Sequence, residues 1–263
     1  MRRAVRVTAN ERLGAYNVLR VADPQMDGVG AGQFAMLAAV ERWGGGEDER
    51  PHLARAFSIA RYAQGDVAYL LEDVGPGTQR LCELGPGDEL WVLGPLGQGF
   101  TAPEESRRAI LVGGGVGIAP LAILQDTLEE AGVEPSVLLG FRDEARVPGA
   151  ELLRRAELAT DDGSAGHDGL VTDLLERELG ADPHATVYAC GPSGMLEGVR
   201  AICERAGVPA QLALEAGMAC GFGACFGCVV PARDGGYLRV CVDGPVIDAA
   251  ALDRVDAHTG APE

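Results

Sequence analysis

The sequence predicts a multidomain protein: an antiparallel β-barrel, then an α/β domain with a parallel sheet, then a small cysteine-rich domain. Three observations predict this order. Short strand-like segments broken by turns fill residues 1–100, strands alternate with helices over 101–210, and four cysteines lie within 211–263. The last segment is too short for an ordinary hydrophobic core, so we expect a bound metal cluster to stabilise it.

The first hundred residues contain six segments that are rich in β-forming residues or alternate between apolar and polar, with Gly, Pro and Asp between them. Six short strands favour a small antiparallel barrel. The expected strands are 4–8, 16–22, 33–38, 56–60, 66–71 and 89–93. The glycine-rich, charged segment 43–51 is expected to be a surface loop.

From about residue 101 apolar strands alternate with helices. The expected strands are 109–112, 137–139 and 186–190, and the expected helices are 121–131, 170–179 and 195–206. In the first helix Leu121, Leu124 and Leu128 share one face, and Gly132 ends it. This alternation implies a parallel sheet covered on both faces, which binds ligands at the carboxyl ends of its strands.

Four cysteines dominate the last fifty residues. Cys220, Cys225 and Cys228 are spaced C-x4-C-x2-C, and Cys241 follows after twelve intervening residues. This is the ligand order of a plant-type [2Fe–2S] cluster. Structural zinc sites usually pair two short cysteine knuckles, so zinc is the less favoured alternative, and two disulfides are less favoured still. Small residues lie between the ligands, as a loop around a cluster requires: Gly221, Gly223, Ala224 and Gly227.

The formal net charge is −17, from 22 Lys and Arg against 39 Asp and Glu. Nucleic acids and anionic membranes bind basic surfaces, so neither is expected as a partner. No apolar run approaches the roughly 20 residues that span a bilayer, and the first residues resemble a strand rather than a signal peptide. The sequence therefore predicts a cytoplasmic protein.

Two patterns in the barrel segment fit a nucleotide cofactor. The first is Arg55 to Ser58 on a predicted strand, and the second is Gly77-Thr78 in a turn further along. An Arg can bind a phosphate through two hydrogen bonds, and the backbone and hydroxyl of a Gly-Thr turn can donate to a pyrophosphate. Each pattern is weak alone, because Arg and Ser also occur on solvated strand faces and Gly-Pro-Gly-Thr is common in ordinary turns.

The segment 112–120 joins a buried strand to a helix, where backbone N–H groups and the helix dipole can hold a pyrophosphate. Pro120 fits the first helical turn. The pattern is G-x-G-x-x-P rather than the dinucleotide fingerprint, and such a turn can also be purely structural. Cys190, Gly191 and Pro192 end another strand of this sheet and are expected to shape the same pocket. The glycines of the first turn are Gly113, Gly114, Gly115 and Gly117.

These motifs together resemble the ferredoxin reductase family: R-x-x-S and G-T in a barrel, then G-G-G-x-G-x-A-P, then C-G-P. The C-terminal C-G-x-G-x-C-x-x-C, followed by V-C-x-D-G-P-V, narrows the resemblance to the electron-transfer subunits of dihydroorotate dehydrogenase B. This resemblance covers the whole chain. It implies a barrel that binds FAD, a parallel sheet that binds NAD and a C-terminal [2Fe–2S] domain.

The resemblance also implies which residues bind each cofactor. FAD would contact Arg55, Ala56, Phe57, Ser58, Leu70, Leu71, Glu72, Gly77 and Thr78. NAD would contact Gly113, Gly114, Gly115, Gly117, Pro120, Cys190, Gly191 and Pro192. The cluster ligands would be Cys220, Cys225, Cys228 and Cys241.

Two positions qualify this assignment. Ala56 stands where the family has a proline, which should cost rigidity more than contact. Arg142 and Asp143 follow the second strand of the sheet, where a basic residue could meet a 2′-phosphate and an acidic one a 2′-hydroxyl. The residues leave NAD and NADP open, and the resemblance favours NAD.

The function implied by the resemblance is electron transfer between NAD and a separate FMN-containing dihydroorotate dehydrogenase catalytic subunit, in pyrimidine biosynthesis. Two copies of each chain would form a heterotetramer. No side chain is expected to act as an acid or base. One alternative is a subunit of an NAD(P)H:ferredoxin or sulfide oxidoreductase, in which an Asp stands at the position of Cys220. The other is a redox-sensing module without turnover.

Overall fold

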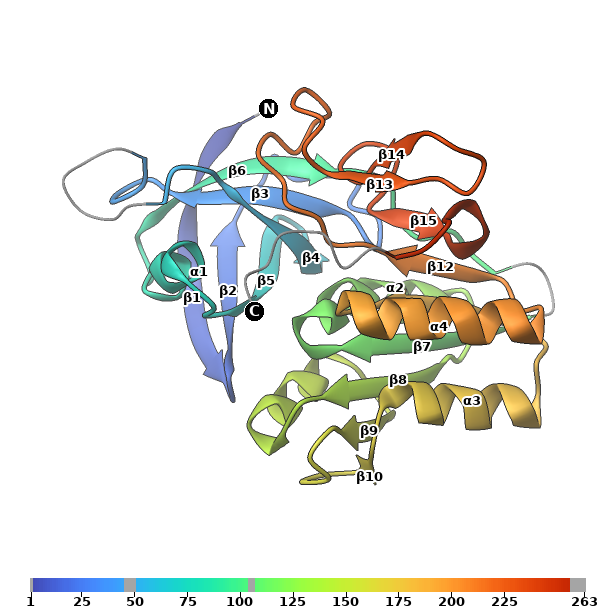
Figure 1. Ribbon diagram of the computed structural model, residues 1–263. Helices are drawn as coiled ribbons and strands as arrows, with labels where there is room; N and C mark the ends of the chain where they lie inside the picture. The colour runs from blue at the N-terminus through green and yellow to red at the C-terminus, as the bar shows by residue number, and fades with distance from the viewer. Residues whose placement is uncertain (1, 45–50, 104–106, 256–263) are drawn as a thin grey trace.

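The computed structural model describes residues 2–44, 51–103 and 107–255. Most of the expected surface loop 43–51 lies outside these residues. Figure 1 shows the β-barrel on one side, in blue to cyan, and a larger sheet flanked by helices on the other. The C-terminal segment, in orange and red, runs across the top of both. No helix of the described chain is both long and apolar enough to cross a membrane.

Six antiparallel strands close into a barrel in the order β1-β2-β5-β4-β3-β6, as the sequence predicts. Alternate side chains fill the interior, which buries Leu19, Leu37 and Leu90 among others. The strands are β1 (Arg3–Leu13), β2 (Tyr16–Ala22), β3 (Phe34–Ala39), β4 (Arg55–Ala63), β5 (Asp66–Glu72) and β6 (Glu89–Leu96).

A short helix, α1 (Pro76–Cys82), stands after β5 where the sequence predicted only a turn. Pro76 fits its first turn because that position needs no N–H donor. Leu81 is completely buried and packs with the barrel interior. The Gly-Pro-Gly-Thr segment is therefore the start of a helix, with free N–H groups of its own.

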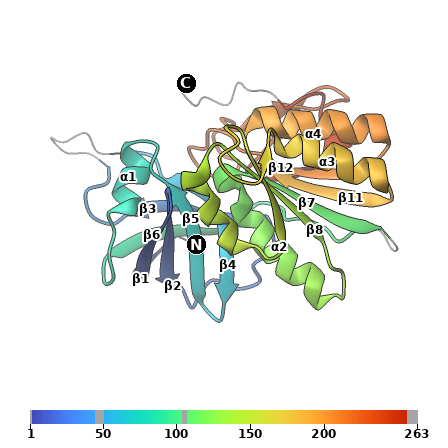
Figure 2. The same ribbon diagram turned by 90° about the horizontal axis from the view of Figure 1, so that it is seen from below.

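The second sheet has seven strands in the order β10-β9-β8-β7-β11-β12-β15. Its first six strands are parallel, and β15 pairs antiparallel with β12. Figure 2 shows α3 and α4 on one face of the sheet and α2 on the other, between the sheet and the barrel. The strands are β7 (Arg108–Gly114), β8 (Ser136–Phe141), β9 (Ala156–Thr160), β10 (His167–Asp168), β11 (Ala185–Cys190), β12 (Ala210–Ala213) and β15 (Val246–Asp248), and the helices are α2 (Ala119–Glu130), α3 (Val171–Ala181) and α4 (Ser193–Ala206).

Several short elements have no counterpart in the sequence prediction: β9, β10, β12, β15 and the 3₁₀ helices η1 (Gly115–Ile118), η2 (Glu144–Leu152) and η3 (Ala249–Ala251). A hairpin, β13 (Val229–Pro231) and β14 (Tyr237–Arg239), follows the cysteine loop. The sequence predicts a strand over 237–242, but β14 ends at Arg239, because the chain turns there towards Cys241.

The C-terminal segment is continuous with the rest of the molecule. The expected boundary between residues 210 and 211 falls inside β12, and β15 adds a seventh strand to the sheet. Cys228 and Cys241 share a hydrophobic core with Phe34 and Met36 of the barrel. The cysteine segment is thus packed against both the barrel and the sheet.

Candidate functional site

The barrel is open between β4 and β5 at one end. Their pairing runs from Ala63–Asp66 to Ile59–Tyr69 and ends there. Residues 55–58 remain paired with β3, and residues 70–72 remain paired with β2. The two backbone edges that face each other are therefore not paired with one another. All the strand residues that the sequence assigned to FAD lie along these two edges, which offer donors and acceptors to a flat polar ring.

The side chains on these edges differ in what they can contact. Phe57 is half-buried against the barrel interior, and Ala56 is exposed. Leu70 and Leu71 are buried in two different cores, so only their backbone can meet a ligand. Glu72 is paired with Arg146 of η2, with 2.9 Å between Nη2 and Oε1. Its carboxylate therefore links the barrel to the second domain.

The Arg55 side chain lies over the N-terminus of α1. A Cβ at Gly77 would lie 2.6 Å from Arg55 Nε, so the guanidinium packs directly on this glycine. Arg55 also donates to the carbonyl oxygen of Leu53 at 2.5 Å. Because the first N–H groups of a helix have no intrahelical acceptor, the guanidinium and these N–H groups together suit a phosphate.

Thr78 contributes differently from what the sequence suggested. Its hydroxyl donates to the carbonyl oxygen of Gly75 at 2.9 Å and accepts from the N–H of Val74 at 2.9 Å. The hydroxyl is thus occupied within its own turn. A phosphate at this place would meet the backbone N–H of Thr78 and not its hydroxyl.

The two glycine-proline turns of the second sheet touch at its carboxyl edge. Gly113 is in register with Cys190 on the neighbouring strand. A Cβ at Gly117 would lie 2.6 Å from the Cα of Gly191, and one at Gly114 would lie 2.9 Å from Cδ of Pro192. Only glycine permits this approach of the backbones. Pro120 lies in the first turn of α2, with the 3₁₀ turn η1 before it.

Cys190 and Glu215 meet at the same edge of the sheet. Cys190 is 2% exposed, and burial, followed by the charge of Glu215, raises the pKa of its thiol. Cys190 is therefore a neutral thiol. Glu215 follows β12 and is exposed, and desolvation raises its pKa. Glu215 was not predicted from the sequence, although an acidic residue directly after an apolar strand of a parallel sheet can indicate a ligand site.

The four predicted ligands come together as two pairs. Cys225 contributes to the lowered pKa of Cys220, and the N–H of Cys241 donates to Cys228 Sγ at 3.4 Å. Desolvation, then the hydrogen bond and charge of Cys228, and also the charge of Cys220, raise the pKa of Cys241 to about 12. The two pairs therefore lie near each other. In the described chain no three His, Cys, Asp or Glu side chains are grouped for a single metal ion. Two pairs suit a two-iron cluster better than a zinc tetrahedron.

The loop around Cys220 directs backbone donors at sulfur. Although desolvation raises the pKa of Cys220, hydrogen bonds from the backbone of Phe222, Cys225 and Ala224 lower it to about 6. Gly221 and Gly223 have φ of 80° and 86°, conformations that favour glycine. N–H groups aimed at thiolate sulfur are the environment of an iron–sulfur cluster, so the residues present fit that group.

Three large aromatic side chains of the cysteine segment are exposed. Phe222 is 58% exposed, Phe226 is 63% exposed and Tyr237 on β14 is 73% exposed. Arg239 lies over Phe226, with 5.4 Å from its Cζ to the ring centroid. We call Phe222, Phe226 and Tyr237 the aromatic patch. Exposed aromatic groups of this kind are typical of a protein interface.

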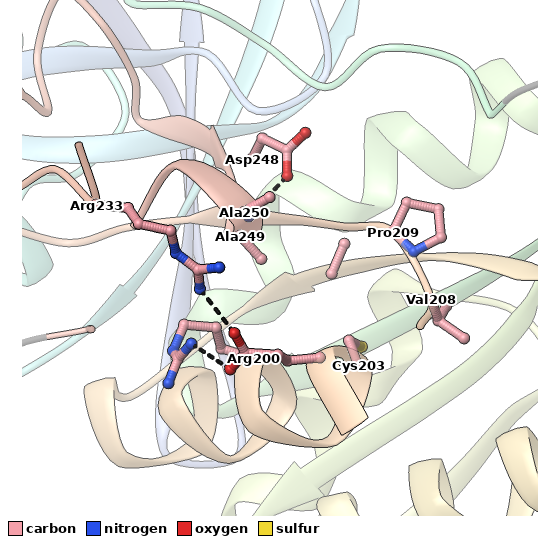
Figure 3. Close-up of a pocket in the computed structure, with 10 residues that line it drawn as sticks. Arg200, Cys203, Val208, Pro209, Arg233, Asp248, Ala249 and Ala250 are labelled. Carbon is pink, nitrogen blue, oxygen red and sulfur yellow. Dashed lines mark hydrogen bonds and ion pairs between the residues drawn. The ribbon is translucent and has the colours of Figure 1, made fainter. Parts of the chain in front are cut away.

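A separate small pocket lies between α4 and the C-terminal segment, away from the residues described above (Figure 3). Its volume is about 90 Å³. Arg200 and Arg233 each pair with Glu204 at 3.0 Å, so their charges are satisfied within the wall. Burial raises the pKa of the lining Cys203 thiol to about 12, which leaves it neutral. No sequence-predicted cofactor residue lines this pocket.

Comparison with protein families matches two regions of the chain. Residues 215–253 match the iron-sulfur cluster binding domain of dihydroorotate dehydrogenase B. Residues 111–201 match an oxidoreductase NAD-binding domain. The first match contains all four cysteines, and the second contains both glycine-proline turns.

Curated relatives cover most of the chain. The electron transfer subunit of dihydroorotate dehydrogenase B (NAD(+)) from Geobacillus kaustophilus is 44% identical over 214 residues, which is 77% of this chain and 80% of the relative. A homolog of that subunit from Aquifex aeolicus is 35% identical over 233 residues, or 87% and 88% of the two chains.

Among solved structures, one of an NADH-dependent reduced ferredoxin-NADP oxidoreductase superposes with a TM-score of 0.82 at 26% identity. It covers 95% of this chain and 90% of its own. The ferredoxin reductase of carbazole 1,9a-dioxygenase superposes with a TM-score of 0.66 at 21% identity, over 79% of this chain and 66% of its own. The second likeness shows the fold alone.

Proposed function

Because the chain belongs to the family of dihydroorotate dehydrogenase B electron transfer subunits, we propose that it passes electrons between NAD and a partner dehydrogenase in pyrimidine biosynthesis. The observation that carries this proposal is the pairing of Cys220 with Cys225 and of Cys228 with Cys241, in a segment packed on both the barrel and the NAD-type sheet. A single chain thus holds the three sites that such a transfer needs.

The residues present fit the three cofactors. Arg55, the start of α1 and the facing edges of β4 and β5 would hold FAD. The turns at Gly113–Pro120 and Cys190–Pro192 would hold NAD, and the four cysteines would hold the cluster. When bound, these groups supply hydride exchange at the flavin and one-electron transfer at the cluster.

The chain's own residues bind and orient, and none has to move a proton. The glycine turn brings backbone N–H groups to a pyrophosphate without a side chain in the way. Cys190 is a buried neutral thiol that would lie beside the nicotinamide and does not act as a nucleophile. Arg61 holds the barrel on the second domain, donating to the carbonyl oxygen of Ala122 at 2.6 Å and to that of Leu152.

The partner in this proposal is the FMN-containing dihydroorotate dehydrogenase catalytic subunit, in a cytoplasmic heterotetramer with two copies of each chain. The relatives are named as electron transfer subunits of dihydroorotate dehydrogenase B, which supports a separate dehydrogenase chain. The aromatic patch supports the cysteine segment as the surface that contacts the partner, because electrons must leave the chain near the cluster.

Affinity purification of the full chain from its native cells tests the proposal. We expect an FMN-containing dehydrogenase chain to co-purify in equal amount, and the complex to reduce NAD+ when dihydroorotate is added. Co-purification of a ferredoxin, or of no flavoprotein at all, would contradict the proposed partner. Protein that binds no flavin would contradict every enzymatic role.

One alternative has a specific observation in its favour. The NADH-dependent reduced ferredoxin-NADP oxidoreductase superposes over 95% of this chain. A ferredoxin-linked function shares all three cofactor sites and differs in the partner. Cys220 argues for the first proposal, since the sequence resemblance associates an Asp at that position with the ferredoxin-linked subunits. The co-purifying chain distinguishes the two.

A further inference from the structure

Trp43 lies beside Arg55, the side chain on which the proposed FAD site depends. The Cζ of Arg55 stands over the Trp43 ring, 5.9 Å from its centroid. The two residues meet because the segment between them is closed at its base, where the N–H of Gly44 donates to the carbonyl oxygen of Pro51 at 2.8 Å. Arg55 is also fixed to the barrel by its pairing with Leu37 of β3. The sequence predicts only a surface loop at this place.

The contacts of the Arg55 guanidinium leave most of its N–H groups free for a ligand. Among the described residues only Leu53 accepts a hydrogen bond from it, at 2.5 Å from Nη1. The guanidinium packs on Gly77, where a Cβ would lie 2.6 Å from Nε. A guanidinium has five N–H donors, and a contact with an aromatic ring uses none of them. The Trp43 ring therefore restrains Arg55 without competing with a phosphate.

The hydrogen bonding of the indole does not explain where Trp43 lies. Its Nε1 is buried and makes no hydrogen bond to a described residue. A buried N–H without an acceptor costs free energy, so other contacts must hold the ring in place. These contacts are the packing of the ring against the barrel interior and its approach to Arg55. The negative face of an aromatic ring attracts a cation, and tryptophan does so most strongly.

We propose that Trp43 is a positioning residue of the FAD site, whose ring holds the Arg55 guanidinium where it meets a phosphate group of FAD. An arginine side chain has many rotamers, and one that is already fixed loses less entropy when it binds a phosphate. This inference rests on the proposed FAD site and adds the residue that prepares Arg55 for it.

The test is the rate at which FAD leaves the full, loaded chain, followed by the rise in flavin fluorescence after dilution. Trp43→Leu keeps an apolar side chain against the barrel but removes the ring. We expect about threefold to fivefold faster release, the effect of one partly exposed contact between a cation and a ring. Trp43→Phe keeps a ring without an N–H and should restore most of the retention. Equal losses in both variants would assign the effect to Nε1 and overturn the role of the ring.

Trp91→Leu is the matched control. Trp91 also has an arginine over its ring, with 4.4 Å from Arg2 Cζ to the centroid, but it lies on β6, outside the residues assigned to FAD. We expect FAD release from this variant to equal that of the unmodified chain. Faster release from both tryptophan variants would indicate a general effect of removing a tryptophan from the barrel and would overturn the inference.

A double variant shows whether Trp43 acts through Arg55. In the Arg55→Gln chain, Trp43→Leu should cause no further acceleration of FAD release, because the guanidinium that the ring positions is gone. A purely structural role of Trp43 would accelerate release equally in both backgrounds, and that result would overturn the inference.

A fluorinated ring tests the same contact without a change of shape that disturbs folding. The sequence has two tryptophans, so Trp43 is the only one in the Trp91→Phe chain. Replacing it with 5-fluorotryptophan draws electron density away from the ring face, and FAD release should become about twofold faster. The same label in the Trp43→Phe chain should change nothing. An unchanged rate in the first labelled chain would overturn the inference.

Failure of this inference can be distinguished from failure of the proposed function. An unmodified chain that binds FAD, with unchanged release from Trp43→Leu, would overturn only the role of Trp43. Unchanged release from Arg55→Gln would contradict the assignment of Arg55 to FAD. A chain that binds no FAD would contradict the proposed function itself.

Discussion

Gly77 determines where the guanidinium of Arg55 can lie. Since a Cβ there would stand 2.6 Å from Arg55 Nε, we expect Gly77→Ala to displace the guanidinium from the start of α1. FAD should then bind about tenfold more weakly, the effect expected for one lost charged hydrogen bond. The ratio of flavin to protein after gel filtration measures this loss. Gly75→Ala is the control, because a Cβ at Gly75 would meet no atom within 4 Å. Equal flavin retention in both variants would contradict the assignment of Arg55.

Replacement of a predicted cysteine ligand can be compared with replacement of a cysteine outside the cysteine loop. Cys225→Ser should abolish the visible absorbance of the cluster and the bound iron, and should loosen the C-terminal segment that the cluster stabilises. Cys82→Ser is the control, since Cys82 is a free, half-buried thiol outside the cysteine loop. Iron and sulfide assays with visible spectra measure both. A Cys225→Ser protein that keeps iron, sulfide and spectrum would show that the ligand set is wrong.

At the residue scale, sequence reasoning works where spacing alone carries the chemistry. The C-x4-C-x2-C motif and the glycine run could be predicted because their residues are close along the chain. Arg146 and Glu215 could not be predicted, because each is defined by neighbours from distant segments. Thr78 was identified, but its hydroxyl is used within its own turn, which a motif does not reveal.

Among the elements, α3 is fixed to the sheet through Glu178. This carboxylate accepts from Arg108 of β7 at 2.8 Å and from Ser136 of β8 at 2.8 Å, and the hydrogen bond from Arg108 is the main cause of its lowered pKa. A lowered folded-state pKa stabilises the fold above the unfolded pKa of about 4.3, and this stabilisation is lost as the pH falls through the folded value.

We therefore expect Glu178→Gln to lower the melting temperature at pH 7, and the difference from the unmodified chain to shrink as the pH falls below about 4. Thermal unfolding followed by circular dichroism across this range measures the effect. Glu130→Gln, on an exposed position of α2, should show no such difference at any pH. A difference for Glu178→Gln that is constant with pH would contradict the ion pair as its cause.

Long, strongly patterned elements could be predicted and short ones could not. The six barrel strands and the helices α2, α3 and α4 have clear periodicity, and the structure confirms them. β10 has two residues and β13, β14 and β15 have three each, so their sequences carry too little pattern. These strands exist because the cysteine loop and the sheet edge position them.

On the scale of the whole molecule, the cysteine segment joins the two larger parts. It shares a core with Phe34 and Met36 of the barrel, and β15 extends the sheet. The division into residues 1–100, 101–210 and 211–263 remains a proposal, because the last boundary lies within β12. The predicted cluster ligands and the aromatic patch therefore lie in a segment that is packed on both larger parts.

The aromatic patch should matter for assembly and not for the cofactors. We expect Phe226→Ala and Tyr237→Ala, combined, to weaken binding of the partner dehydrogenase about thirtyfold or more, as loss of a buried aromatic anchor does, with unchanged flavin and iron content. Binding by surface plasmon resonance measures this. Leu170→Ala is the control, since Leu170 is an apolar residue of similar exposure, 56%, that lies outside the cysteine segment. Equal losses in both variants would contradict a specific docking surface.

The central claim is that one chain links NAD to a [2Fe–2S] cluster through a flavin. Anaerobic titration of the isolated, fully loaded chain with NADH, followed by visible absorbance and electron paramagnetic resonance, tests it most directly. We expect NADH to bleach the flavin and to produce the signal of a reduced two-iron cluster, with the cluster signal absent in Cys225→Ser while flavin reduction persists. A chain whose flavin is reduced while its intact cluster stays oxidised at excess NADH would contradict the claim.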